Sequence, residues 1–144
     1  MSLSDPVILT NSISGAVANA TVPKVTVVIR KAYGAGYYVM NGRAYEPDLI
    51  VAWPSAEISV MGAEGAVNII FRRQVEESDD PEAKRAELVD GFRKVIDPYI
   101  AAGNALIDDV IDPRETRPTV IRAFEMAATK RVQRPWKRHG VMPV

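Results

Sequence analysis

The hydrophobic pattern predicts a buried strand followed directly by a glycine turn. Residues 24–30 hold five consecutive β-branched side chains between a lysine and an arginine. A run without polar alternation is typical of a strand in a sheet that is covered on both faces. Gly34-Ala35-Gly36 comes next, and residues 37–40 lead to Asn41-Gly42, a natural place for a helix to stop. We therefore expect a strand, a glycine turn and a short helix.

The rest of the chain alternates between short apolar runs and amphipathic segments. We expect a short helix at 13–20 ended by Pro23, strands at 49–53, 57–61 and 105–111, and helices over 62–71, from Asp80-Pro81 to Asp97-Pro98, and after residue 116. Asp80 is the expected cap of the long helix, whose apolar stripe contains Leu88, Phe92, Val95 and Ile96. Asp112 and Thr116 are both candidate caps for the last helix, which carries Val120, Ile121, Phe124 and Ala127.

The length of the chain and its ordinary content of hydrophobic (47%) and charged (25%) residues indicate one domain over residues 1–144. Residues 1–20 form a lead-in of mixed small, polar and apolar types. Residues 130–144 are a basic tail with Trp136, and such a tail is either a solvated end or a segment that docks on a neighbouring subunit.

Composition excludes several classes of function. The 18 basic residues balance the 18 acidic ones, so no global field favours nucleic acid as a partner. The chain has no cysteine and one histidine, His139, which excludes thiolate chemistry and disulfides and leaves a poor ligand set for zinc, so we expect no metal. The sequence shows no apolar run of membrane-spanning length and no signal-peptide pattern, so we expect no membrane partner. The lack of cysteine favours a reducing cytoplasm as the location.

The glycine turn is the strongest candidate for chemistry. Small residues at 34–36 allow backbone N–H groups at a helix start to point at an oxygen that gains negative charge, as in an oxyanion hole. From spacing alone, a Gly-x-Gly after a strand is more often a simple tight turn.

Two other residue pairs can be interpreted either as structural or as functional. Tyr37 and Tyr38 either line a pocket or belong to the core, and the pocket interpretation suits Tyr38 better. Asp108 and Asp109 are adjacent on an expected strand, so their side chains point to opposite faces and do not form a catalytic carboxylate pair.

Four motifs in order resemble the C-terminal part of the biotin-dependent acyl-CoA carboxyltransferase subunits of the propionyl-CoA and methylcrotonyl-CoA carboxylase beta-subunit family. Their sequences are RKAYGAGYYVM (residues 30–40), WPSAEISVMGAEGA (53–66), IDDVIDPRETR (107–117) and RPWKRHG (134–140). Many members carry Gly-Gly-Ala where this chain has Gly34-Ala35-Gly36. Details of the motifs point to both propionyl-type and methylcrotonyl-type subunits, so the acyl group stays open.

The resemblance implies an α/β fold, a ClpP/crotonase-like half-domain of layered short strands with surrounding helices. It implies that the backbone amides of Ala35 and Gly36 stabilise the ureido oxyanion of biotin, with Gly34 and Tyr38 also in the cofactor site. The implied cofactor is carboxybiotin on a carrier domain, and the implied substrate is an acyl-CoA held by the N-terminal carboxyltransferase domain of a neighbouring subunit in a homo-oligomer. A biotin carboxylase and biotin carrier subunit is the implied partner, and the piece alone is expected to be inactive.

Two alternatives remain open at the level of sequence. The same site run in reverse serves a biotin-dependent acyl-CoA decarboxylase, and the chain is also compatible with a non-catalytic oligomerisation module. A hydratase of the same fold needs a carboxylate above the CoA, and the sequence does not indicate one.

Overall fold

The computed structural model describes residues 6–133 as an α/β structure. The strands are β1 (Val25–Val28), β2 (Lys31–Tyr33), β3 (Leu49–Ala52), β4 (Glu57–Ser59) and β5 (Asp109–Val110). The helices are α1 (Pro6–Asn19), α2 (Ala35–Val39), α3 (Ala63–Ile70), α4 (Arg72–Glu76), α5 (Pro81–Arg93), α6 (Pro98–Gly103) and α7 (Thr116–Met126), with short 3-10 turns η1 (Arg43–Tyr45) and η2 (Pro113–Glu115).

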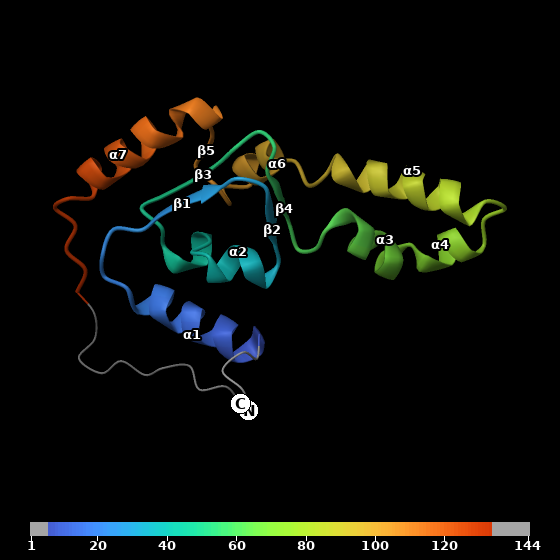
Figure 1. The fold of residues 1–144 in the computed structure, drawn as a ribbon, viewed down its shortest axis with the longest axis horizontal. Helices are drawn as coiled ribbons and strands as arrows, with labels where there is room; N and C mark the ends of the chain where they lie inside the picture. The colour runs from blue at the N-terminus through green and yellow to red at the C-terminus, as the bar shows by residue number, and fades with distance from the viewer. Residues whose placement is uncertain (1–5, 134–144) are drawn as a thin grey trace.

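The strands form two small parallel sheets. One sheet has the order β1-β3-β5, and β2 pairs with β4 in the other. Parallel neighbours need crossover connections, and here helices and turns supply them. Helices α2 and α1 lie on one side of the larger sheet and α7 lies on the other (Figure 1). The expected class, α/β with layered short strands, is therefore confirmed.

The main core lies where β1 and β3 meet α2 and α6. Its buried members are Val28, Tyr37, Ile50, Ala52, Ala56, Ile58, Ala101 and Ile107. A second cluster joins α3 to α5 through Ala63, Val67, Val89 and Ile96. The segment α3–α4–α5 extends as a helical arm away from the sheets (Figure 1). The fold thus holds the α2 region in the main core and leaves the arm to pack mostly on itself.

Several boundaries and caps match the sequence. The side chain of Asp80 accepts a hydrogen bond from the Ala83 amide and caps α5, as expected. The Asp112 side chain accepts from the Arg114 amide and caps η2, which leads directly into α7. Thr116 instead binds Trp53, whose ring N–H donates to its hydroxyl at 2.9 Å. Asp112 thus caps η2 but not α7, which starts after Glu115 without a side-chain cap, so neither candidate caps the last helix itself. Thr116 joins α7 to the residue that follows β3.

Other expectations are wrong. The strand predicted at 24–30 is shorter, and only Val28 of β1 is buried, because β1 is an edge strand with one neighbour within the described residues. The strand predicted at 105–111 shrinks to two residues. Helices α4 and α6 and strand β2 were not predicted. In the apolar stripe of the long helix, Val95 lies beyond α5 and is 56% exposed.

The faces of the last helix also differ from the prediction. Ile121 and Phe124 are about half exposed, whereas Ala123 and Ala127 are buried. The first helix starts at Pro6, earlier than expected, and ends before Pro23 as predicted. No helix within residues 6–133 is long and apolar enough to cross a membrane. His139, Trp136 and the motif at 134–140 lie outside the described residues.

Candidate active site

The candidate site is built on the turn between β2 and α2. Strand β2 pairs with β4, so that Tyr33 lies opposite Ser59, and the Gly34 amide donates to the Ser59 carbonyl at 2.9 Å. Gly34 then adopts φ 50° and ψ −126°, a combination open almost only to glycine. A Cβ at this position would lie 2.8 Å from the Val60 carbonyl oxygen. Glycine is thus required here both by conformation and by space.

Helix α2 opens with two amides for which the described residues offer no hydrogen-bond acceptor. The amides of Ala35 and Gly36 are its first two, and no acceptor for either occurs among residues 6–133, whereas the Tyr37 amide already donates to the Gly34 carbonyl at 3.2 Å. Both residues are exposed. Neighbouring free N–H groups of this kind can bind one oxygen that gains negative charge.

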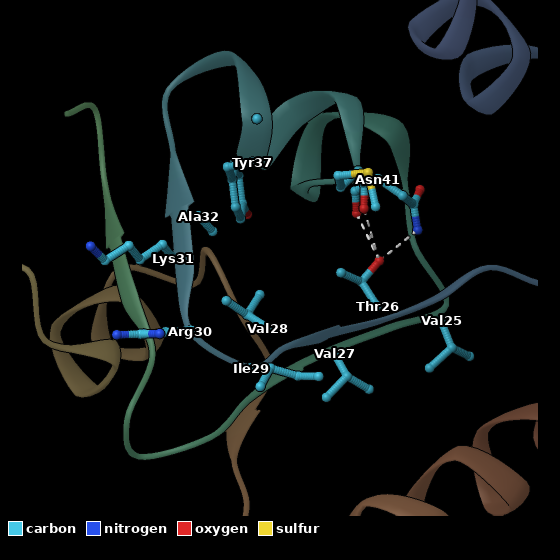
Figure 2. A pocket seen from close by; sticks show the side chains of 12 residues that line it. Val25, Thr26, Val27, Val28, Ile29, Arg30, Lys31, Ala32, Tyr37 and Asn41 are labelled. Carbon is cyan, nitrogen blue, oxygen red and sulfur yellow. Dashed lines mark hydrogen bonds between the residues drawn. The ribbon is translucent and has the colours of Figure 1, made fainter. Parts of the chain in front are cut away.

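Two cavities flank this turn. The first, here the β1 cavity, measures about 530 Å³ and lies between β1, the following residues 29–32, and Gly36, Tyr37, Met40 and Asn41 of α2 and its end (Figure 2). The second, here the Tyr38 cavity, measures about 320 Å³ and includes Gly34 and Tyr38. Its wall is largely apolar, with Val60, Val95, Ile100 and Leu106 among its members.

The two tyrosines of α2 have different roles. Tyr37 is 7% exposed, its hydroxyl donates to the Leu106 carbonyl at 2.6 Å, and it accepts from the Arg43 amide at 3.1 Å. Tyr38 is 49% exposed and meets the Tyr37 ring edge-on at a centroid distance of 5.4 Å. Tyr37 is therefore a core residue that fastens α2, and Tyr38 faces its cavity.

A side-chain hydrogen bond next to the turn was not predicted from the sequence. The Tyr33 hydroxyl donates to Oε2 of Glu57 on the neighbouring strand. Burial and this hydrogen bond to the Glu57 carboxylate raise the pKa of Tyr33 to about 12. The pair holds the end of β2 beside β4, immediately before Gly34. A strand of three residues between Arg30 and Gly34 is too short to show a period, so its pairing left no sequence signal.

Asn41 closes α2 at the other end. It is 8% exposed, has φ 68°, and its Nδ2 donates to the Thr26 hydroxyl at 2.9 Å (Figure 2). The Thr26 hydroxyl in turn donates to the Asn41 carbonyl at 3.1 Å. Asn41 therefore ends the helix, as predicted, and also ties it to β1.

The paired aspartates have the structural roles expected of them. Asp108 binds Arg43 at 2.6 Å and accepts from the Ile50 amide at 2.8 Å. Asp109 accepts from the Val110 amide. No group of three or more histidine, cysteine, aspartate or glutamate side chains suited to a metal ion occurs within residues 6–133.

The family model for the carboxyl transferase domain matches residues 11–142. The chain is 53% identical over 129 residues to the methylmalonyl-CoA carboxyltransferase 12S subunit of Propionibacterium freudenreichii subsp. shermanii, covering 89% of this chain and 25% of that protein. It is 46% identical over 130 residues to a putative propionyl-CoA carboxylase beta chain of Bacillus subtilis (strain 168), covering 90% of this chain and 26% of that one.

A solved structure is also similar to this chain, with a comparable sequence identity and coverage. The crystal structure of transcarboxylase 12S, with methylmalonyl-coenzyme A and methylmalonic acid bound, superposes with a TM-score of 0.85 at 50% identity, over 94% of this chain and 26% of that one. The crotonase-like fold expected from the motifs is thereby confirmed. The chain spans about a quarter of the length of these relatives. With a family model over nearly its whole length, the chain belongs to the carboxyl transferase domain family.

Proposed function

We propose that this chain is the biotin-facing piece of an acyl-CoA carboxyltransferase, in which the amides of Ala35 and Gly36 donate to the ureido oxygen of biotin. The observation that carries the proposal is a pair of adjacent exposed N–H groups without an acceptor among the described residues, at a turn that only glycine at 34 permits. Membership of the carboxyl transferase domain family supports the reaction class.

The two amides fit the charge that develops in carboxyl transfer. Carboxybiotin supplies an activated carboxyl group and, once that group has left, a basic ureido group able to take the α-proton of an acyl-CoA. The negative charge of that basic ureido group would lie largely on its oxygen, where the N–H dipoles held by α2 would stabilise it without reorganising. Removal of one such donor in other enzymes costs about 3–4 kcal/mol of transition-state stabilisation, so two donors make a substantial contribution.

The order Gly34-Ala35-Gly36 suits this role because the donors belong to the backbone. The first glycine makes the turn, and the next two residues contribute only their N–H groups. A Cβ built at Gly36 meets nothing within 4 Å, so the protein itself does not need a glycine there. Ala35 is exposed, so the protein interior does not require its methyl group either.

The Tyr38 cavity suits the apolar part of the cofactor. It includes Gly34, the residue directly before Ala35, and its aliphatic wall and half-exposed tyrosine ring match the fused rings and hydrocarbon arm of biotin. Tyr38 thus gives the ring system a surface, while the amides hold its polar end.

The acyl-CoA comes from elsewhere in this proposal. A neighbouring subunit's N-terminal domain holds the acyl-CoA, and a carrier subunit delivers carboxybiotin. The similar crystal structure of transcarboxylase 12S holds methylmalonyl-coenzyme A, which makes a short branched acyl group the first substrate to try. We further propose that residues 1–144 act as one unit and that the enzyme works in the cytoplasm.

A titration with free biotin tests the site. In the ¹⁵N-labelled chain, the amide signals of Ala35 and Gly36 are expected to move downfield as biotin is added, and Tyr38 ring signals are expected to shift with them. The diamine that lacks the ureido carbonyl is the matched control and is expected to leave both amides in place. A non-catalytic oligomerisation module would show no shift at either amide with biotin, and that result would remove the support for the proposal.

A further inference from the structure

We infer that Tyr33 and Glu57 are positioning residues that fix the direction of the Ala35 and Gly36 amides. This role rests on the proposed function for its effect on biotin binding, but the direction of the two N–H groups can be measured without any ligand. Its basis is that no side chain caps the start of α2, while the strand before it is tied down by a side-chain hydrogen bond.

The two ends of α2 are held differently. Helix α2 has five residues, and its N-cap Gly34 makes no side-chain hydrogen bond to the first turn. A helix of this length is not stable by itself. Its far end is fastened by the Tyr37 hydroxyl, which donates to the Leu106 carbonyl at 2.6 Å, and by the hydrogen bonds between Asn41 and Thr26. The direction of its first two N–H groups then follows from where β2 delivers Gly34.

Strand β2 is too short for its backbone pairing alone to hold its register firmly. Its three residues run parallel to β4 (Figure 1), so that Tyr33 lies opposite Ser59, two residues beyond Glu57. A slip by one residue would turn every side chain to the other face of the sheet. The Tyr33 hydroxyl reaches diagonally back along β4 and donates to the Glu57 carboxylate. Hydrogen bonds to ionised acceptors are about twice as strong as neutral ones, so this contact opposes the slip.

The Tyr33 ring packs on the residue where α3 begins. A Cβ built at Gly62, the N-cap of α3, would lie 3.0 Å from Cε2 and 3.4 Å from Cζ of this ring. Gly62 has φ −67° and ψ 158°, angles open to any residue, so its missing side chain provides space for the ring. At Gly34 a Cβ would lie 2.8 Å from the Val60 carbonyl oxygen. Because Gly34 directly follows Tyr33, a displacement of Tyr33 disturbs both close contacts.

Loss of the Tyr33–Glu57 hydrogen bond therefore reaches the two amides through the turn. Gly34 donates its own N–H to the Ser59 carbonyl at 2.9 Å, and its φ of 50° sets the direction of the peptide groups that follow. If β2 loosens against β4, that angle is no longer fixed, and the N–H groups at 35 and 36 spread over a wider range of directions. Hydrogen bonds weaken steeply as the donor turns away from the acceptor.

Residual dipolar couplings of the ¹⁵N-labelled chain measure the directions of the two N–H groups without ligand. Tyr33→Phe keeps the ring over Gly62 but removes the donor, and Glu57→Leu removes the acceptor. In both variants the Ala35 and Gly36 N–H groups are expected to turn by at least about 20° or to lose most of their coupling. Glu57→Gln keeps a side-chain oxygen as acceptor and is expected to retain the couplings of the parent chain.

Titration of the same variants with free biotin gives the second readout. Tyr33→Phe and Glu57→Leu are expected to bind biotin about three- to tenfold more weakly than the parent chain, and Glu57→Gln within about twofold of it. Val89→Ala leaves a gap in the buried cluster that joins α3 to α5 and is the control for general destabilisation. It is expected to lower the free energy of unfolding and to leave the couplings and the biotin affinity unchanged.

The outcomes separate the positioning role from the proposed function. If the parent chain does not bind biotin, the proposed function fails, and the couplings alone decide the positioning role. If the parent chain binds biotin but Tyr33→Phe and Glu57→Leu keep its couplings or its affinity, the positioning role is refuted and the biotin site stands. Equal changes in Val89→Ala would also overturn the role, because any loss of packing would then loosen the turn. Glu57→Gln behaving like Glu57→Leu would overturn it too, because the acceptor oxygen would not be what matters.

Discussion

Replacing Gly34 by alanine is expected to unfold the turn that presents the two amides. At φ 50° and ψ −126° a side chain costs about 1–3 kcal/mol, because this region is open almost only to glycine. The added Cβ would also lie 2.8 Å from the Val60 carbonyl oxygen, which is backbone and cannot move without shifting the end of β4. Together these effects give an expected loss of about 2–4 kcal/mol in the free energy of unfolding.

Gly36→Ala is the matched control for this prediction. It lies two residues away, has helical geometry in α2, and its new Cβ would meet nothing within 4 Å. Glycine to alanine at a compatible position stabilises a protein by about 0.4–1 kcal/mol. Urea unfolding of both variants, followed by circular dichroism, gives the two free energies. If Gly34→Ala falls within about 0.5 kcal/mol of the parent chain, the turn does not have the geometry described.

Three further predictions concern the residues that hold the site. Tyr37→Phe leaves the Leu106 carbonyl and the Arg43 amide without their buried partner, so it is expected to lower the free energy of unfolding in urea by about 1–3 kcal/mol. Tyr38→Phe is expected to lower it by less than about 0.5 kcal/mol. Equal losses in the two variants would contradict the core role of Tyr37. Asp108→Ala removes the acceptor for Arg43 and the Ile50 amide and is expected to cost about 1–2 kcal/mol by the same measurement, whereas Asp109→Ala, which loses only a contact to the next residue, is expected to cost little. The pKa of Tyr33 is raised from 10.0 to about 12, so the stabilisation that its protonated hydroxyl gives is present below pH 10 and is lost between pH 10 and about 12. The fall in unfolding free energy over that window is expected to be smaller in Tyr33→Phe. An equal fall in both proteins would refute the raised pKa of Tyr33.

Much of the fold could be predicted because local signals were strong. Asp80-Pro81 is a cap followed by a proline at the first helical turn, and α5 starts there. The run at 49–53 is apolar throughout, and β3 is buried at Ile50, Val51 and Ala52. The glycine turn was placed correctly because Gly34 occupies a conformation that the sequence had to encode with glycine.

Other features depend on contacts between distant segments and left no local pattern. Strand β2 has three residues, so only its pairing with β4 defines it. The burial of Tyr37 and the exposure of Tyr38 follow from where α2 meets Leu106, about seventy residues later in the chain. The Tyr33–Glu57 hydrogen bond likewise spans two strands. The edge position of β1 could not be inferred from its own residues, which are those of a central strand.

The most direct test of the central proposal is to remove the two N–H groups themselves. Incorporating lactic acid at position 35 or glycolic acid at position 36 replaces each amide by an ester and leaves the side chain unchanged. Each ester is expected to weaken the binding of free biotin about two- to tenfold, since a hydrogen bond to an uncharged oxygen contributes about 0.5–1.5 kcal/mol. Glycolic acid at Gly65, in the first turn of α3, is the control and is expected to leave binding unchanged. Unaltered affinity with both esters at 35 and 36 would contradict the account.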